Sequence, residues 1–199
     1  MKVTDVIFGL VCGRTIGYLV GDFLKAWGVE LNIYYQLMIW LAFPFFTLFC
    51  LWLAYLIGRK FLFIFQSAKF VLVGAFATIV DLKVFEWLVF AFSMAITVNP
   101  IIAKGLSFLF ATALKFWGNK YWTFQKHEKE DVLKEISQFF GVTAVGLIID
   151  VVAYQYFTQV MGAQFGAPEA IWIKFSVIFA GLCAAIFNFL GYKFFVFKK

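Results

Sequence analysis

The chain has 199 residues, of which 64% are hydrophobic and 22% aromatic, and its mean hydropathy is +0.91. Only 14% of the residues are charged, too few to coat a soluble domain, so the composition excludes a soluble enzyme and indicates an integral membrane protein. The net charge of +6 comes from scattered Lys and Arg without a basic stripe, so we expect no nucleic-acid partner.

Residues 3–27 are the least hydrophobic candidate membrane span, since they include Arg14 among other charges. On hydropathy alone this segment would be an interfacial amphipathic helix. Its glycines favour a spanning helix instead, because they recur every four residues and so lie on one helix face, where a second helix can approach closely. These glycines are Gly9, Gly13, Gly17 and Gly21. The alternative is that they fill space without a specific partner.

The segment Leu31 to Gly58 contains no charged residue. At 1.5 Å per residue it is long enough to cross the roughly 30 Å hydrocarbon core, so it is the surest span. Pro44 in its middle is expected to kink the helix. We expect a basic turn after it that carries Arg59, Lys60 and Lys69.

Four further spans are expected at about 70–91, 96–118, 137–160 and 171–192. The charged segment 125–135 is expected to be a solvated linker that forms a short surface helix. The predicted fold is therefore an all-α polytopic membrane protein with six transmembrane helices. We expect an N-terminal transmembrane hairpin in residues 1–66 and a four-helix membrane domain in residues 67–199.

The four-helix domain contains a repeat. A shift of 69 residues places Phe70 on Phe139 and Asp81 on Asp150, and a shift of 73 residues places Phe124 on Phe197. The 4-residue difference falls in the connections between helices. The repeats, about 69–124 and 138–197, predict two parallel helical hairpins with a site between them.

The ends of these hairpins carry motifs that resemble the GtrA-like family, which includes the transmembrane domain of polyprenyl-phosphate mannose synthase. A helix opens FxxVG with an aspartate seven residues after the glycine. The returning helix ends N-(K/R)-x-(W/F)-(T/V)-F, and in the second copy the ending is NFxxxxKxxVF. The first copy has Phe70, Val73, Gly74, Asp81, Asn119, Lys120, Trp122, Thr123 and Phe124 at these positions, and the second ending has Asn188, Phe189, Lys193, Val196 and Phe197. The copies differ where Lys115 aligns with Asn188 and Asn119 with Tyr192. The resemblance implies a flippase of polyprenyl-phosphate-linked sugars in cell-surface polysaccharide synthesis, or a membrane domain beside a polyprenyl-phosphate glycosyltransferase.

The loops predict the orientation. In the six-span model the connections 28–32, 92–100 and 161–170 contain no Lys or Arg, so both termini are expected in the cytoplasm of a protein of the cytoplasmic (inner) membrane. The basic residues on the other side are Lys2, Arg59, Lys60, Lys69, Lys120, Lys126, Lys129, Lys134, Lys193, Lys198 and Lys199.

Four charged residues fall at bilayer depth, where each charge costs at least about 2.5 to 3.5 kcal/mol. Asp81 and Asp150 lie near the midplane of their spans, Lys104 lies at the depth of Asp81, and Arg14 reaches a similar level. They are candidates for the charged centre of a transport path. The equally weighted alternative is that they are buried ion pairs that fix helix register.

A second group at the cytoplasmic ends of the returning helices is a candidate site for a lipid phosphate. It consists of Lys115, Asn119, Lys120, Asn188 and Lys193. The alternative is an aromatic belt with snorkelling lysines, which we favour for Lys120 and Lys193.

The sequence has no catalytic triad, water-exposed carboxylate pair or metal-ligand cluster, so we expect a protein that is not an enzyme and uses no cofactor and no metal. The expected partners are membrane lipids and the lipid-linked sugar, with a glycosyltransferase and further copies of the chain as additional candidates. The alternatives to a flippase are a non-catalytic anchor for a glycosyltransferase and a small-cation transporter.

Overall fold

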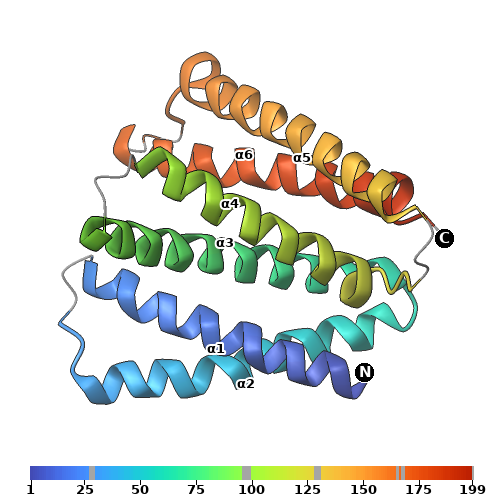
Figure 1. Ribbon diagram of the computed structural model, residues 1–199, viewed down its shortest axis with the longest axis horizontal. Helices are drawn as coiled ribbons and strands as arrows, with labels where there is room; N and C mark the ends of the chain where they lie inside the picture. The colour runs from blue at the N-terminus through green and yellow to red at the C-terminus, as the bar shows by residue number, and fades with distance from the viewer. Residues whose placement is uncertain (27–29, 96–99, 128–130, 165, 167–168, 199) are drawn as a thin grey trace. The chain divides into compact units, whose positions relative to one another are not determined.

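The computed structural model describes residues 1–26, 30–95, 100–127, 131–164, 166 and 169–198. The described residues are helical, with short connections and without strands. In chain order the elements are α1 (Val3–Ala26), α2 (Ile33–Gly58), α3 (Leu62–Ala95), α4 (Pro100–Trp117), η1 (Gly118–Thr123), α5 (Val132–Gln155), η2 (Tyr156–Met161), α6 (Glu169–Gly191) and η3 (Tyr192–Val196). Figure 1 shows them from blue at the N-terminus to red at the C-terminus.

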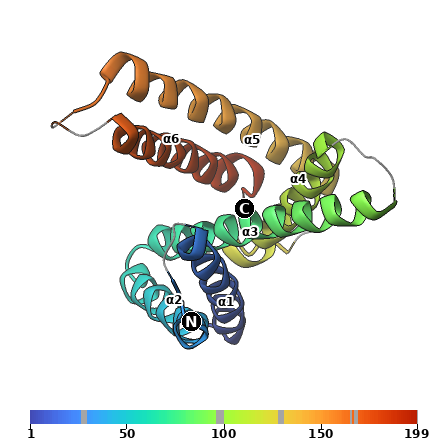
Figure 2. The ribbon, with the colours of Figure 1, turned by 90° about the vertical axis from the view of Figure 1, so that its left-hand side faces the viewer.

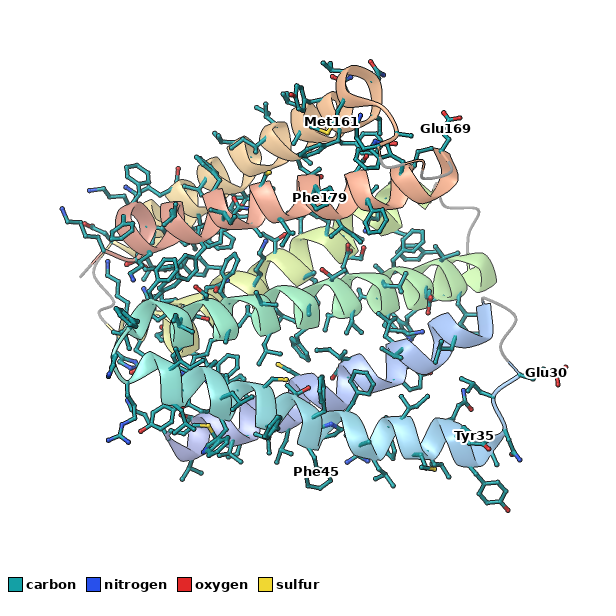
Figure 3. All side chains as sticks on the ribbon, turned by 180° about the vertical axis from the view of Figure 1, so that it is seen from behind. Glu30, Tyr35, Phe45, Met161, Glu169 and Phe179 are labelled. Atoms are coloured by element: carbon teal, nitrogen blue, oxygen red, sulfur yellow. The ribbon has the colours of Figure 1, made fainter. Side chains whose placement is uncertain are left out.

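Five of these helical segments are long and apolar enough to cross a membrane. They are Val3–Gly21, Ile33–Gly58, Leu62–Phe92, Val132–Met161 and Phe175–Val196. Many large apolar side chains on them are exposed, among them Phe45, which projects from α2 in Figure 3 and is 69% exposed. The chain is therefore a multi-pass α-helical membrane protein. The sixth span stays a prediction, because α4 is not among these five segments.

The glycine face of α1 packs against α2, as its four-residue spacing predicts. A Cβ added at Gly13 would lie 2.7 Å from the Pro44 Cα atom, and a Cβ at Gly17 would lie 2.7 Å from the Phe43 Cβ atom. Residues larger than glycine would therefore force the helices apart. Pro44 is buried at this crossing, where the close approach of α1 covers the backbone that the proline leaves without its usual hydrogen bond.

Two expectations about the connections are wrong. Lys69 does not lie in a basic turn, because α3 begins at Leu62 and carries Lys69 as a buried residue seven positions later. No separate surface helix forms in the described part of 125–135, because α5 begins at Val132 and Glu135 in its first turn is buried beside the Lys126 ammonium, 2.9 Å away. Residues 128–130 of this linker lie outside the described residues.

Two compact units divide the chain, Met1–Gln125 and Lys126–Lys199. The boundary between these units falls between the two hairpins α3–α4 and α5–α6. Within the first unit α1 and α2 pack together and α3 packs on α4, and within the second unit α5 packs on α6. Figure 2 shows the paired helices within each unit.

The two hairpins close in the same way at positions that the 69- and 73-residue shifts align. A Cβ at Gly118 would meet Val73 at 3.0 Å, and a Cβ at Gly191 would meet Val142 at 2.6 Å. Both returning helices then change to a π-helical turn, η1 and η3. In these turns the Phe124 N–H donates to the Asn119 carbonyl over 2.9 Å and the Phe197 N–H donates to the Tyr192 carbonyl over 2.7 Å. Such turns are rare and are frequent at functional sites.

Candidate functional site

The carboxylate of Asp81 is held by α4. The Lys104 Nζ atom lies 2.5 Å from Asp81 Oδ2, and the Ser107 hydroxyl donates to Asp81 Oδ1 over 2.7 Å. The equal depth of Asp81 and Lys104 in the sequence indicated their proximity, whereas Ser107 was not predicted. Because Lys104 and Ser107 are three residues apart, they lie on one face of α4 and together contact both oxygens of the carboxylate.

Asp150 occupies the aligned position in the second hairpin and has different surroundings. The 73-residue shift aligns Lys104 with Val177 and Ser107 with Ala180, so the second hairpin has no cation or hydroxyl at these two positions. Asp150 is partly buried within the candidate span Val132–Met161, and within the described chain it makes no hydrogen bond or ion pair. A carboxylate in that setting is available to accept hydrogen bonds from a ligand, or to bind a proton.

Arg14 is not brought to Asp81. Its guanidinium stacks on the Trp40 ring of α2, with the Cζ atom 3.7 Å from the ring centroid. Its side chain therefore reaches toward the end of the hairpin at which α2 begins. The expectation that Arg14 acts together with Asp150 stays a prediction, since these residues belong to different compact units.

The phosphate candidates of the first hairpin lie at the junction of α4 and η1. The Asn119 Nδ2 group donates to the Lys115 carbonyl over 2.9 Å, and Asn119 is fully buried. The Oδ1 atom of Asn119 and the Oγ1 atom of Thr123 have no hydrogen-bond partner among the described residues. Lys120 is also fully buried, so the interpretation of this residue as a snorkelling lysine is wrong.

The candidates of the second hairpin, Asn188 and Lys193, lie at the corresponding end of α6 and η3. The Asn188 amide packs against Gly146, where an added Cβ would overlap it, and its Oδ1 atom has no hydrogen-bond partner in the described part of the chain. The Lys193 Nζ atom lies 5.4 Å from the centre of the Phe194 ring. Lys193 thus remains consistent with an aromatic belt position.

A buried charge cluster in the first unit was missed by the sequence reasoning. The Lys69 ammonium forms an ion pair with the Asp5 carboxylate, and both side chains are almost fully buried. The Asp5 carboxylate also accepts hydrogen bonds from the Trp122 Nε1–H over 3.0 Å and from the Lys2 backbone N–H over 2.7 Å. The cluster joins α1 to α3 and η1. Asp5 and Lys69 stand near the ends of apolar runs, where sequence reasoning treats charges as solvated.

The fold and these sites define a multi-pass helical membrane protein with a domain of two hairpins, each of which has an aspartate at the aligned position within a candidate membrane span. The family model for the GtrA/DPMS transmembrane domain matches residues 69–197. The chain therefore belongs to the GtrA/DPMS transmembrane-domain family, whose members are membrane proteins of glycan and polyprenyl-sugar metabolism.

The chain is also similar to the uncharacterized membrane protein YwcD of Bacillus subtilis (strain 168), with 29% identity over 132 residues. The alignment covers 65% of this chain and 94% of that protein. No solved structure matches the chain. Helices α1 and α2 precede the residues that the family model matches.

Proposed function

We propose that this protein moves a polyprenyl-phosphate-linked sugar across the cytoplasmic membrane for the synthesis of a cell-surface polysaccharide or glycan. The protein acts by binding and moving its substrate and carries out no covalent chemistry. The family assignment supports the substrate class. The observation that supports translocation is the Asp150 carboxylate, which lies inside a candidate membrane span and has no hydrogen-bond or ion-pair partner among the described residues.

The proposal gives the two aspartates different roles. Burying a charge in a bilayer is costly, so in this proposal a carboxylate that pairs with none of the described residues serves a purpose other than fixing helix register. Asp150 accepts hydrogen bonds from the sugar hydroxyls as the headgroup crosses the membrane. Asp81 is held by Lys104 and Ser107 and fixes the packing of α3 on α4.

The lipid phosphate enters at the ends of the returning helices. In this proposal Lys115 supplies a positive charge at the end of α4, and the Asn188 amide supplies a hydrogen-bond donor at the end of α6. Asn119 and Lys120 shape the first of these ends through the π-helical turn η1, and Lys193 lies in η3 at the second.

The test is translocation by the purified protein alone. Vesicles containing the protein and a fluorescent polyprenyl-phosphate sugar are treated with a membrane-impermeant reagent that destroys exposed fluorophore. A flippase exposes the inner-leaflet lipid and raises the destroyed fraction from about half toward completion, whereas protein-free vesicles stay at about half. A glycosyltransferase anchor leaves the fraction at half, and so does a cation transporter, which instead dissipates an imposed cation gradient.

A further inference from the structure

The α1–α2 hairpin, which precedes the family domain, contains a groove at its loop end. Gly13 and Gly17 hold the two helices in close contact, but a Cβ at Gly21 would meet nothing nearer than Gln36 Cγ at 3.8 Å. The helices therefore separate beyond Gly17 and leave a cavity of about 280 Å³. Besides Gln36, it is lined by Gly17, Tyr18, Gly21, Ile33, Leu37 and Trp40.

Arg14 lies at the inner end of this groove. Its guanidinium stacks on Trp40, one of the lining residues, at 3.7 Å. Stacking uses the planar face of the guanidinium and leaves the N–H groups on its edge for a ligand. Arg14 is exposed and makes no hydrogen bond or ion pair with the described residues. A charge in a membrane requires a partner, and the guanidinium edge matches a phosphate.

The depth of Arg14 indicates which part of a lipid it meets. Trp40 is seven residues after Ile33, so it lies about 10 Å from the start of α2. The 26-residue helix exceeds the hydrocarbon core by about 9 Å, which places the Arg14–Trp40 stack about 5 Å inside the core boundary. Figure 3 shows Glu30 and Tyr35 at this end of the hairpin. A lipid phosphate drawn slightly inward reaches Arg14.

From Arg14 the groove runs toward the loop end, which is the direction of the lipid headgroup and not of the lipid chain. A group that fills the groove would therefore be attached to the phosphate on the side away from the lipid chain. Its surroundings combine the aromatic rings of Trp40 and Tyr18, which match the C–H faces of a sugar, with the Gln36 amide, which matches sugar hydroxyls.

We infer that the α1–α2 hairpin binds the sugar-phosphate headgroup of a polyprenyl lipid, with the phosphate on Arg14 and the sugar in the groove beside Trp40. The inference rests on the substrate class of the proposed function. It adds a headgroup site outside the family domain, at the end of the hairpin opposite the N-terminus. A snorkelling arginine without a ligand is the competing account.

The experiment measures lipid binding to the purified full chain by native mass spectrometry. The probes are a short-chain polyprenyl phosphate glucose, the same polyprenyl phosphate without glucose, and glucose 1-phosphate. Arg14→Gln should weaken binding of both lipids about tenfold or more, because each loses a charge-assisted hydrogen bond. Gly21→Leu fills the groove and should weaken only the glycosylated lipid. Glucose 1-phosphate should bind more weakly than the glycosylated lipid, since it has no chain in the bilayer.

Matched controls separate the site from general effects. Arg59→Gln removes an exposed arginine at the other end of α2, and Gly141→Leu places the same side chain on α5, where an added Cβ would meet nothing within 4 Å. Both should bind like the wild type. Wild-type affinity of Arg14→Gln overturns the inference, and so does an equal loss of both lipids in Gly21→Leu. If only Asp150→Asn weakens binding, the inference fails and the proposed function stands. If the wild type binds as expected but does not translocate lipid, the proposed function fails and the inference stands.

Discussion

Removal of the Asp5 carboxylate should strongly destabilise the first unit. In Asp5→Ala the Lys69 ammonium, with a side chain 1% exposed, loses its ion-pair partner, and the Trp122 indole N–H loses its acceptor. Breaking a buried pair in this way costs about 3 to 5 kcal/mol. We expect about 3 kcal/mol, at the low end of this range, because Lys69 keeps the Trp122 carbonyl at 3.5 Å and the face of the Phe65 ring at 4.3 Å.

A double-mutant cycle of Asp5→Asn, Lys69→Met and the two changes together measures the pair itself. Lys69→Met also leaves an unpaired charge, but that charge keeps two N–H donors, so we expect a smaller loss than in Asp5→Ala. The double variant Asp5→Asn with Lys69→Met carries neither charge and should lie within about 1 kcal/mol of the wild type. The assay is equilibrium unfolding in mixed micelles, followed by tryptophan fluorescence.

The control for this cycle is the exposed pair of Lys83 and Glu86 on α3, whose side chains are 36% and 52% exposed. Glu86→Ala should change the free energy of unfolding by no more than about 0.5 kcal/mol. The reasoning is refuted if Asp5→Ala is as mild as Glu86→Ala, or if the effects of the Asp5→Asn and Lys69→Met changes simply add in the double variant.

Three further predictions concern the helices. Gly13→Leu should reduce the stability of the α1–α2 hairpin by a few kcal/mol, because Gly13 lies against the backbone of α2. Gly21→Leu should leave the stability nearly unchanged, because Gly21 does not touch that backbone. Equal thermal stability of the two variants in detergent would contradict this packing. Asp81→Asn should be unstable because it leaves Lys104 unpaired, and the added change Lys104→Met should restore the midpoint temperature of unfolding. If Lys104→Met does not rescue Asp81→Asn, the charge pair does not fix the packing. In a chain without its native cysteines, Glu30→Cys and Gln164→Cys should react with an impermeant thiol reagent added outside the cell. Lys60→Cys should react only after the cells are permeabilised. Reaction of all three variants from outside would exclude the six-span topology.

The helices were largely predictable because long apolar runs leave few alternatives. The glycine spacing on α1 indicated its packing face, and α2 was expected at 31–58 and forms at Ile33–Gly58. The start of α3 was expected at residue 70, because the charge of Lys69 suggested a loop. The helix in fact begins at Leu62. The pairing of Lys69 with Asp5 depends on a contact between distant segments, which periodicity does not report.

The candidate site was predictable only in part. The equal depth of Asp81 and Lys104 in neighbouring helices correctly predicted that their side chains are in contact. The sequence also contains the difference between the surroundings of Asp81 and Asp150, because the 73-residue shift aligns Lys104 with Val177. The π-helical turns have no propensity signal, since they arise where one extra residue is accommodated in a packed helix.

The central claim is that the two hairpins have diverged, so that Asp150 serves translocation and Asp81 serves packing. The most direct measurement compares Asp150→Asn with the double variant Asp81→Asn and Lys104→Met in the vesicle assay of lipid-linked sugar translocation. Asp150→Asn should fold and insert like the wild type, because Asp150 has no partner among the described residues, yet it should fail to translocate the lipid. The double variant should translocate the lipid at close to the wild-type rate. Translocation by Asp150→Asn at the wild-type rate, or loss of translocation in a stable double variant, would contradict the account.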